Sequence, residues 1–267
     1  MQDRDYVLGT NDEEVDRLGL QHRVWRAKAL EAWRRGGIGP GSVVLDLGSG
    51  PGFAATDLAE IVGPSGKVVA LERSARFLAA LKQRAAALAL GNIEAREQDV
   101  CETPIAGLAD TAWCRWVLSF TAEPRRVVEH IAAALRPGGI AIFHEYADYG
   151  SWRTMPPDPL VERFRGLVMQ SWRESGGEPD VALRLPPLLA DAGLQIVEAR
   201  PLIDIVRSSD FAWRWPAAFM ASNAARLAEL GYVAPAEATA MATALDRLPS
   251  GTLMITPLVA EVIARKA

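Results

Sequence analysis

Short apolar segments alternate with longer amphipathic segments through the first half of the chain. The short segments are rich in β-branched residues and are typical of buried strands. The longer segments repeat apolar residues every three to four positions, which predicts helices. The predicted strands cover residues 42–47, 67–72, 93–97, 111–118 and 140–145. The predicted helices between them cover residues 53–62, about 74–90 and 123–135. This alternation predicts an α/β fold, in which a mostly parallel sheet carries helices on both faces.

The pattern differs on either side of this region. Residues 11–35 form one long amphipathic segment, which predicts an N-terminal helical cap over residues 1–41. Residues 42–146 form the predicted core. Residues 147–267 complete the same domain with two helix-rich insertions, which cover about 147–187 and 210–248. Two last strands are predicted at about 194–200 and 256–264.

A glycine-rich loop follows the first predicted strand and precedes a predicted helix. Gly48, Gly50 and Gly52 alternate with other residues there, and an acidic residue, Glu72, ends the next strand. Glycines let a backbone turn tightly and approach a ligand closely, and a carboxylate at this distance can accept the hydroxyls of a ribose. Nicotinamide dinucleotide folds place glycine or alanine at the sixth position of this loop. Phe53 stands there instead, which disfavours that cofactor.

The segment Val44–Gly52 resembles motif I of the class I S-adenosylmethionine-dependent methyltransferases. Four further segments follow in the family's order over about 105 residues: Glu72, residues 98–100, residues 113–118 and residues 135–139. The resemblance implies a Rossmann-like, seven-stranded sheet whose last strand is antiparallel. It also implies S-adenosyl-L-methionine as the cofactor and a small molecule as the methyl acceptor, of the kind found in quinone or natural-product biosynthesis.

The resemblance assigns roles to individual residues. The residues expected to bind the cofactor are Tyr6, Gln21, Asp46, Gly48, Gly50, Gly52, Glu72, Arg73, Asp99, Val100 and Arg115. His144 and Glu145 end the fifth strand, where the acceptor pocket of this family opens. A histidine or carboxylate there could take a proton from an oxygen or nitrogen acceptor, so both are candidate general bases.

The two insertions resemble the variable lid of small-molecule methyltransferases. Four of the eight tryptophans fall within them: Trp152, Trp172, Trp213 and Trp215. Tryptophan suits apolar and aromatic pockets, so we expect an apolar or aromatic acceptor.

Composition limits the remaining possibilities. The formal net charge is −4, which disfavours a polynucleotide partner. The two cysteines and three scattered histidines predict neither a disulfide framework nor a metal site. The first residues are polar and no apolar run approaches 18 residues, so the sequence predicts a cytoplasmic protein that crosses no membrane. A homodimer is possible. A nicotinamide oxidoreductase, a macromolecule methyltransferase and a non-catalytic cofactor-binding protein remain alternatives.

Overall fold

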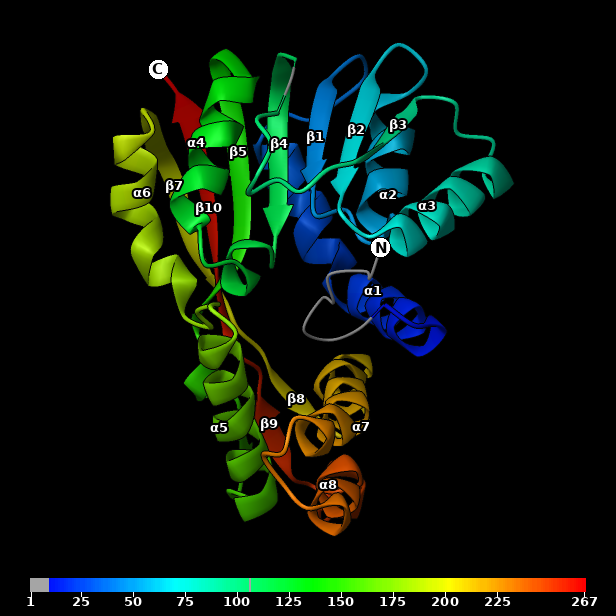
Figure 1. Ribbon diagram of the computed structural model, residues 1–267, viewed down its shortest axis with the longest axis vertical. Coiled ribbons are helices and arrows are strands. Elements are labelled where there is room, and N and C mark those ends of the chain that lie inside the picture. The colour runs from blue at the N-terminus through cyan, green and yellow to red at the C-terminus, as the bar shows by residue number, and fades with distance from the viewer. Residues whose placement is uncertain (1–9, 106) are drawn as a thin grey trace.

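A seven-stranded sheet forms the upper half of the molecule in Figure 1. The computed structural model describes residues 10–105 and 107–267. The strand order is β3-β2-β1-β4-β5-β10-β7, and only β10 runs antiparallel to its neighbours. The strands are β1 (Val43–Leu47), β2 (Lys67–Glu72), β3 (Ile93–Glu97), β4 (Ala109–Arg115), β5 (Leu135–Asp148), β7 (Leu194–Leu202) and β10 (Leu258–Lys266). The predicted Rossmann-like sheet with an antiparallel last strand is confirmed.

Helices cover both faces of this sheet, because successive strand residues point to opposite sides. Val44 packs on one face with apolar residues of α1 (Asp12–Arg35) and α2 (Phe53–Val62). Leu45 packs on the other face with α4 (Pro124–Ala134) and α6 (Leu185–Asp191). The helix α3 (Ala75–Ala87) lies beside β3 at the sheet edge.

A second, smaller part lies below the sheet in Figure 1, and we call it the lid. It contains a three-stranded sheet in the order β6-β9-β8 and the helices α5, α7 and α8. Their bounds are β6 (Arg153–Met155), α5 (Pro159–Glu174), β8 (Ile205–Arg207), α7 (Arg214–Glu229), α8 (Pro235–Ala242) and β9 (Leu253–Ile255). The predicted helical insertions are therefore helical. The small sheet was not predicted, because three-residue strands show no periodicity.

Aromatic side chains fill the core of the lid and connect it to α1. The four insertion tryptophans are all buried there, and Trp25 of α1 joins the same cluster. The helix α1 also packs directly against α7. The N-terminal helix therefore touches both the sheet and the lid, and it forms one wall of the space between them.

The ends of some strands differ from the expected positions. The fourth strand stops at Arg115 and not at residue 118, because Trp116 adopts a left-handed backbone conformation with φ of 52°. A short 3-10 turn, Leu118–Phe120, follows. The fifth strand begins at Leu135 and not at residue 140. The last strand lies two residues later than predicted.

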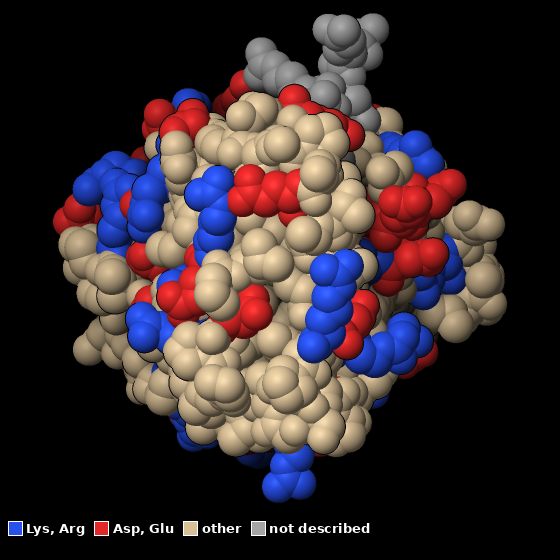
Figure 2. Space-filling view, turned by 90° about the horizontal axis from the view of Figure 1, so that it is seen from below, with Lys and Arg blue, Asp and Glu red and all other residues tan. Residues whose placement is uncertain are grey.

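The surface at the lid end carries charges of both signs. Figure 2 shows blue and red side chains interspersed among uncharged ones on this face. The described part of the face displays no continuous basic stripe of the kind that binds nucleic acid.

Candidate functional site

A cavity of about 440 Å³ lies at the carboxyl ends of β1, β2 and β4. This is the edge at which open α/β sheets bind ligands, and the volume is within the range of small-molecule sites. The glycine loop forms its floor. Gly48 and Gly50 both have positive φ angles, of 61° and 54°. A Cβ on Gly48 would lie 2.6 Å from Val117, whereas a Cβ on Gly50 would meet only one atom, at 4.0 Å. Gly50 therefore leaves room for a ligand to approach the backbone.

Gly52 has a different role from the one expected. It has a φ of 83° at the start of α2, and a Cβ there would lie 2.5 Å from Leu81 of α3. It does not belong to the residues that line the cavity. Its absence of a side chain permits close packing of the loop against α3, so the structure supports a structural role and no ligand contact.

Glu72 links the loop to the cavity. One carboxylate oxygen accepts a hydrogen bond from the Gly50 N–H at 2.9 Å, and the other accepts from the Ser74 N–H at 2.8 Å. Burial raises the pKa of Glu72, against the lowering effect of these two backbone donors. Each oxygen keeps a second lone pair, which can accept a hydroxyl from a ligand in the cavity.

Asp46 and Arg115 form a pair of buried opposite charges on the cavity wall. Burial raises the pKa of Asp46 to about 7, although Arg115 acts in the opposite direction. Burial also lowers the pKa of Arg115 to about 10. The Asp46 Oδ2 and Arg115 Nη1 atoms are buried and have no hydrogen-bond partner among the described residues. Unsatisfied buried charges are costly, so both atoms are suited to a ligand that carries a cation and an anion close together.

The far end of the cavity is formed by the residues that follow β2 and β3. Asp99 and Val100 line it, together with Arg73. The Asp99 carboxylate accepts a hydrogen bond from the Cys101 N–H at 2.8 Å, and Arg73 lies 4.0 Å from its other oxygen. Asp99 can therefore accept a further hydrogen bond from a ligand in the cavity.

The helix α1 contributes Gln21 and His22 to the same cavity. Gln21 was expected there. Tyr6, the other N-terminal candidate, lies outside the described residues. Ten of the expected cofactor-binding residues are thus described, and nine of them line one cavity: Gln21, Asp46, Gly48, Gly50, Glu72, Arg73, Asp99, Val100 and Arg115.

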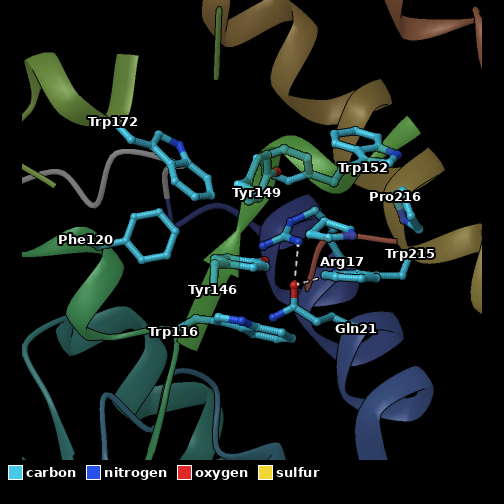
Figure 3. A pocket seen from close by; sticks show the side chains of 12 residues that line it. Arg17, Gln21, Trp116, Phe120, Tyr146, Tyr149, Trp152, Trp172, Trp215 and Pro216 are labelled. Atoms are coloured by element: carbon cyan, nitrogen blue, oxygen red, sulfur yellow. Dashed lines mark hydrogen bonds between the residues drawn. The ribbon is translucent and has the colours of Figure 1, made fainter. Parts of the chain in front are cut away.

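A second, narrower cavity lies between the first cavity and the lid, and Figure 3 shows the side chains around it. Its walls are mostly aromatic: Trp116, Phe120, Tyr146, Tyr149, Trp152, Trp172, Trp215 and Phe219. Gln21, Trp116 and Phe120 line both cavities, so the two spaces adjoin. The Trp116 ring stacks on Tyr146 and Trp215, with centroids 5.5 and 5.7 Å apart. We call this space the aromatic cavity.

Hydrogen bonds fix the polar group at the junction of the two cavities. The Gln21 Oε1 atom accepts from Arg17 Nη1 and from Trp215 Nε1, each at 3.0 Å (Figure 3). Arg17 is itself held by Glu14 at 2.7 Å through two of its nitrogens. With its oxygen occupied, Gln21 can only offer amide N–H donors to a ligand.

His144 and Glu145 line neither cavity. His144 is completely buried between Trp113 and Trp25, and its Nε2 pairs with Glu261 of β10 at 2.9 Å. Burial lowers its pKa far below the usual value, so the imidazole is neutral.

Glu145 is also completely buried. It accepts hydrogen bonds from the N–H groups of Val117, Leu118 and Ser119 and from the Ser119 hydroxyl. Both side chains are buried away from the two cavities, so their placement does not support the expected general base. They hold β5 to its neighbours and shape the turn after β4.

Of the four insertion tryptophans, Trp152, Trp172 and Trp215 line the aromatic cavity and Trp213 does not. The remaining wall was predicted only in part. Trp116 falls within the motif at residues 113–118, but its role depends on a left-handed backbone that no pattern predicts. Phe120 and Phe219 have no sequence feature that distinguishes them from core residues. The described residues contain no group of three or more histidine, cysteine or acidic side chains arranged to hold a metal. Within the same residues, every helix is too short or too polar to span a lipid bilayer.

Comparison with known proteins identifies the family. The sequence profile described as "Methyltransferase domain" matches residues 38–172, half of the chain. The chain is 36% identical to a demethylmenaquinone methyltransferase of Lactococcus lactis over 120 residues, which are 45% of this chain and 46% of the relative. It is 28% identical to an uncharacterized 37.1 kDa protein of a Streptomyces fradiae transposon over 228 residues, 85% of this chain and 63% of the relative. The chain therefore spans less than two thirds of the length of these relatives.

Solved structures agree on the fold. A putative methyltransferase from Bacillus halodurans superposes with a TM-score of 0.59 at 14% identity, covering 89% of this chain and 97% of that one. Coclaurine N-methyltransferase bound to N-methylheliamine and SAH gives a TM-score of 0.56 at 14% identity, covering 90% and 72%.

Proposed function

The chain belongs to the class I S-adenosylmethionine-dependent methyltransferases, and on this premise we propose that it methylates a small apolar or aromatic molecule. The observation that carries the proposal is the aromatic cavity, which adjoins the larger cavity through Gln21, Trp116 and Phe120. Membership of this family also favours the methyl donor over a nicotinamide cofactor as the ligand of the glycine loop.

The residues of the larger cavity fit S-adenosyl-L-methionine, whose sulfonium supplies an electrophilic methyl group when it is bound. Asp46 and Arg115 provide an unpartnered anion and an unpartnered cation for the amino and carboxylate groups of its methionine part. Glu72 provides lone pairs for the ribose, and Asp99 provides one for the adenine amine. The bare backbone at Gly50 leaves space for the ligand.

The aromatic cavity suits a planar ring on chemical grounds. Aromatic pairs prefer stacked or edge-to-face packing and gain about 0.5–1.5 kcal/mol beyond area burial. The ring of Trp116 lies where the aromatic cavity adjoins the larger cavity, so it can stack on a ring there. It holds this position at a φ of 52°, a conformation that costs a non-glycine residue about 1–3 kcal/mol and that is concentrated at functional sites. A quinone-like ring, of the kind named for the Lactococcus lactis relative, has the required shape.

The proton balance favours an acceptor that ionises easily. The side chains around the aromatic cavity include no histidine, aspartate or glutamate among the described residues. A phenol or quinol loses its proton more readily than an alcohol, and the Gln21 amide can donate a hydrogen bond to the resulting oxygen anion. The acceptor's proton would leave to solvent before the lid closes. Transfer would then join the methyl carbon to this oxygen, or to a ring carbon conjugated to it, as its bond to sulfur breaks, and transfer to carbon would also release the proton of that carbon to solvent.

The space in the aromatic cavity is about 30 Å³, which holds one or two water molecules and no ring. We infer that the acceptor enters when the lid moves and that Trp215 then separates from Trp116. Closure of the lid over the acceptor would exclude water from the transfer.

A methyl-transfer assay with a panel of acceptors tests this function. We expect turnover with phenols or quinols and none with aliphatic alcohols or oligonucleotides. Trp116→Ala should raise the KM for the aromatic acceptor at least tenfold and change the affinity for S-adenosylhomocysteine less. Leu183→Ala, which alters an exposed apolar residue that lines neither cavity, is the control. Equal activity on every acceptor class, or no effect of Trp116→Ala, would contradict the proposal. Cytoplasmic location and a homodimer stay predictions.

A further inference from the structure

A chain of hydrogen bonds leads from α2 through α1 to the larger cavity. Asp57 of α2 contacts the Nε2 atom of His22 at 3.0 Å. The Nδ1 atom of His22 contacts the Nη2 atom of Arg115 at 3.2 Å. The Arg115 guanidinium then presents its Nη1 atom, which has no partner among the described residues, at the cavity wall. Three elements, α2, α1 and the end of β4, thus meet through one imidazole.

The two neighbours of His22 determine which ring nitrogen carries the proton. Arg115 can only donate, so the Nδ1 atom of His22 must accept. The proton therefore lies on Nε2 and is donated to Asp57. Burial lowers the pKa of His22, and its hydrogen bond to Asp57 only partly offsets this effect, so the ring is neutral. Asp57 is also held by Arg26 at 2.7 Å, so the acceptor end of the chain is fixed as well.

The ring of His22 is also fixed in position. It is 5% exposed and stacks on Phe53 with centroids 5.9 Å apart. Phe53 in turn packs under the Arg84 guanidinium, which lies 3.8 Å from its centroid. An arginine side chain is long and flexible, and a rigid acceptor beside it selects one orientation of the guanidinium group. A ligand-binding group is placed accurately when neighbouring residues support it in this way.

We propose that His22 is a positioning residue that holds Arg115 for the carboxylate of the cofactor's methionine part, and that Asp57 sets the tautomer in which the imidazole can do so. The proposal rests on the proposed function, because it takes S-adenosylmethionine as the ligand. Arg115 has two guanidinium nitrogens with different tasks. Nη2 is bound to His22, and Nη1 binds the ligand. Asp46, which interacts electrostatically with Arg115, binds the ammonium group of the same methionine part.

The sequence contains nothing that identifies this chain of contacts. His22 and Asp57 are 35 residues apart, and His22 and Arg115 are 93 residues apart. His22 stands on an amphipathic helix, where a histidine is usually a packing residue. Only the fold brings it between an aspartate and an arginine.

Two amide substitutions separate the contacts of His22. The amide of asparagine lies near the position of Nδ1, and the amide of glutamine lies near the position of Nε2. His22→Asn therefore keeps an oxygen acceptor for Arg115, whereas His22→Gln keeps the contact to Asp57 and loses the contact to Arg115. Calorimetric titration of the purified full chain with S-adenosylhomocysteine measures the effect. The control ligand is 5′-methylthioadenosine, which has the adenosine and the thioether but no amino-acid part.

We expect His22→Gln to weaken S-adenosylhomocysteine about ten- to a hundredfold, as loss of an oriented hydrogen bond to a charged group should. His22→Asn should stay within threefold of the wild type, and 5′-methylthioadenosine should bind all three proteins equally. Equal weakening of both ligands, or no difference between the two variants, would overturn the positioning role and leave the cofactor assignment intact. Failure of the wild type to bind S-adenosylhomocysteine would overturn the cofactor assignment and the positioning role together.

Discussion

Glu72 is the residue whose replacement tests the cofactor site most directly. Its carboxylate serves the fold and the ligand at once, because it accepts the N–H groups of Gly50 and Ser74 and faces the cavity. Glu72→Ala removes both functions. Glu97→Ala is a matched control, because Glu97 is the register partner of Glu72 on the neighbouring strand β3 and its side chain is exposed.

The expected magnitudes follow from the number of hydrogen bonds lost. An N–H left without its acceptor costs about 1–3 kcal/mol, but water can reach part of this site, so we expect a total destabilisation of about 2–4 kcal/mol. For a protein of this size each kcal/mol lowers Tm by about 2–4 °C, which predicts a fall of about 4–16 °C. Loss of the ribose contacts should weaken S-adenosylhomocysteine by about 1–3 kcal/mol, or about 5- to 150-fold.

Thermal unfolding and calorimetric titration measure the two effects separately. Glu72→Gln adds a test of charge, because it keeps one oxygen acceptor but places an N–H donor against the second backbone N–H. It should therefore lose ligand affinity and stability to an intermediate extent. If Glu72→Ala folds and binds S-adenosylhomocysteine as tightly as the Glu97→Ala control, the ribose does not lie at Glu72, and the interpretation of the whole glycine loop is wrong.

Three further predictions concern single residues of the site. Gly52→Ala should lower Tm by several degrees, because its Cβ would lie 2.5 Å from Leu81 at a φ of 83°; a Tm equal to that of Gly91→Ala, where nothing lies within 4 Å, would refute the packing role. Because burial raises the pKa of free Asp46 to about 7, an ammonium group that binds beside it should lower this pKa and release a proton. S-adenosylhomocysteine should therefore bind more tightly as the pH rises from about 5 to 7 and no further above that. Titrations in buffers of different ionisation enthalpy should detect the released proton, and Asp46→Asn should abolish it. Glu145→Gln, which replaces a side chain that accepts five hydrogen bonds, should lower Tm but leave the pH profile of methyl transfer unchanged; a shifted profile would restore Glu145 as a candidate base.

The sequence predicted the sheet and its helices correctly, because these elements follow from the local pattern of apolar and polar residues. The alternation of strands and helices gave the sheet and its helices, because burial on two faces requires apolar strands at regular intervals. Nine of the ten described cofactor candidates line one cavity. Eight of them lie at or just after strand ends, which meet at one edge of a parallel sheet, and Gln21 reaches the cavity from α1. The prediction that Gly52 binds the ligand lacks support for a local reason. A glycine can permit close packing of a helix as well as close approach of a ligand.

The parts that failed depend on which way a side chain points across several elements. His144 and Glu145 stand on a strand with neighbours on both sides, and their side chains point into the packed layers and not beyond the strand end. His22 and Phe120 reach the site only through contacts with distant segments. The direction of such side chains is set by tertiary packing, which a one-dimensional pattern does not contain.

The small sheet of the lid constrains how the site can open. Each of its strands follows or precedes a strand of the large sheet with few residues between: β6 comes after β5, β8 after β7, and β9 before β10. Three short connections, at residues 149–152, 203–204 and 256–257, therefore join the two halves beside the segment 175–180, which leads from α5 of the lid back to the large sheet. A single loop cannot flap open here, because the three strands are hydrogen-bonded to one another. The lid should instead swing as one rigid body about a hinge line through the three short connections. Stiffening any one of them would then slow entry of the acceptor and release of the product without altering either cavity.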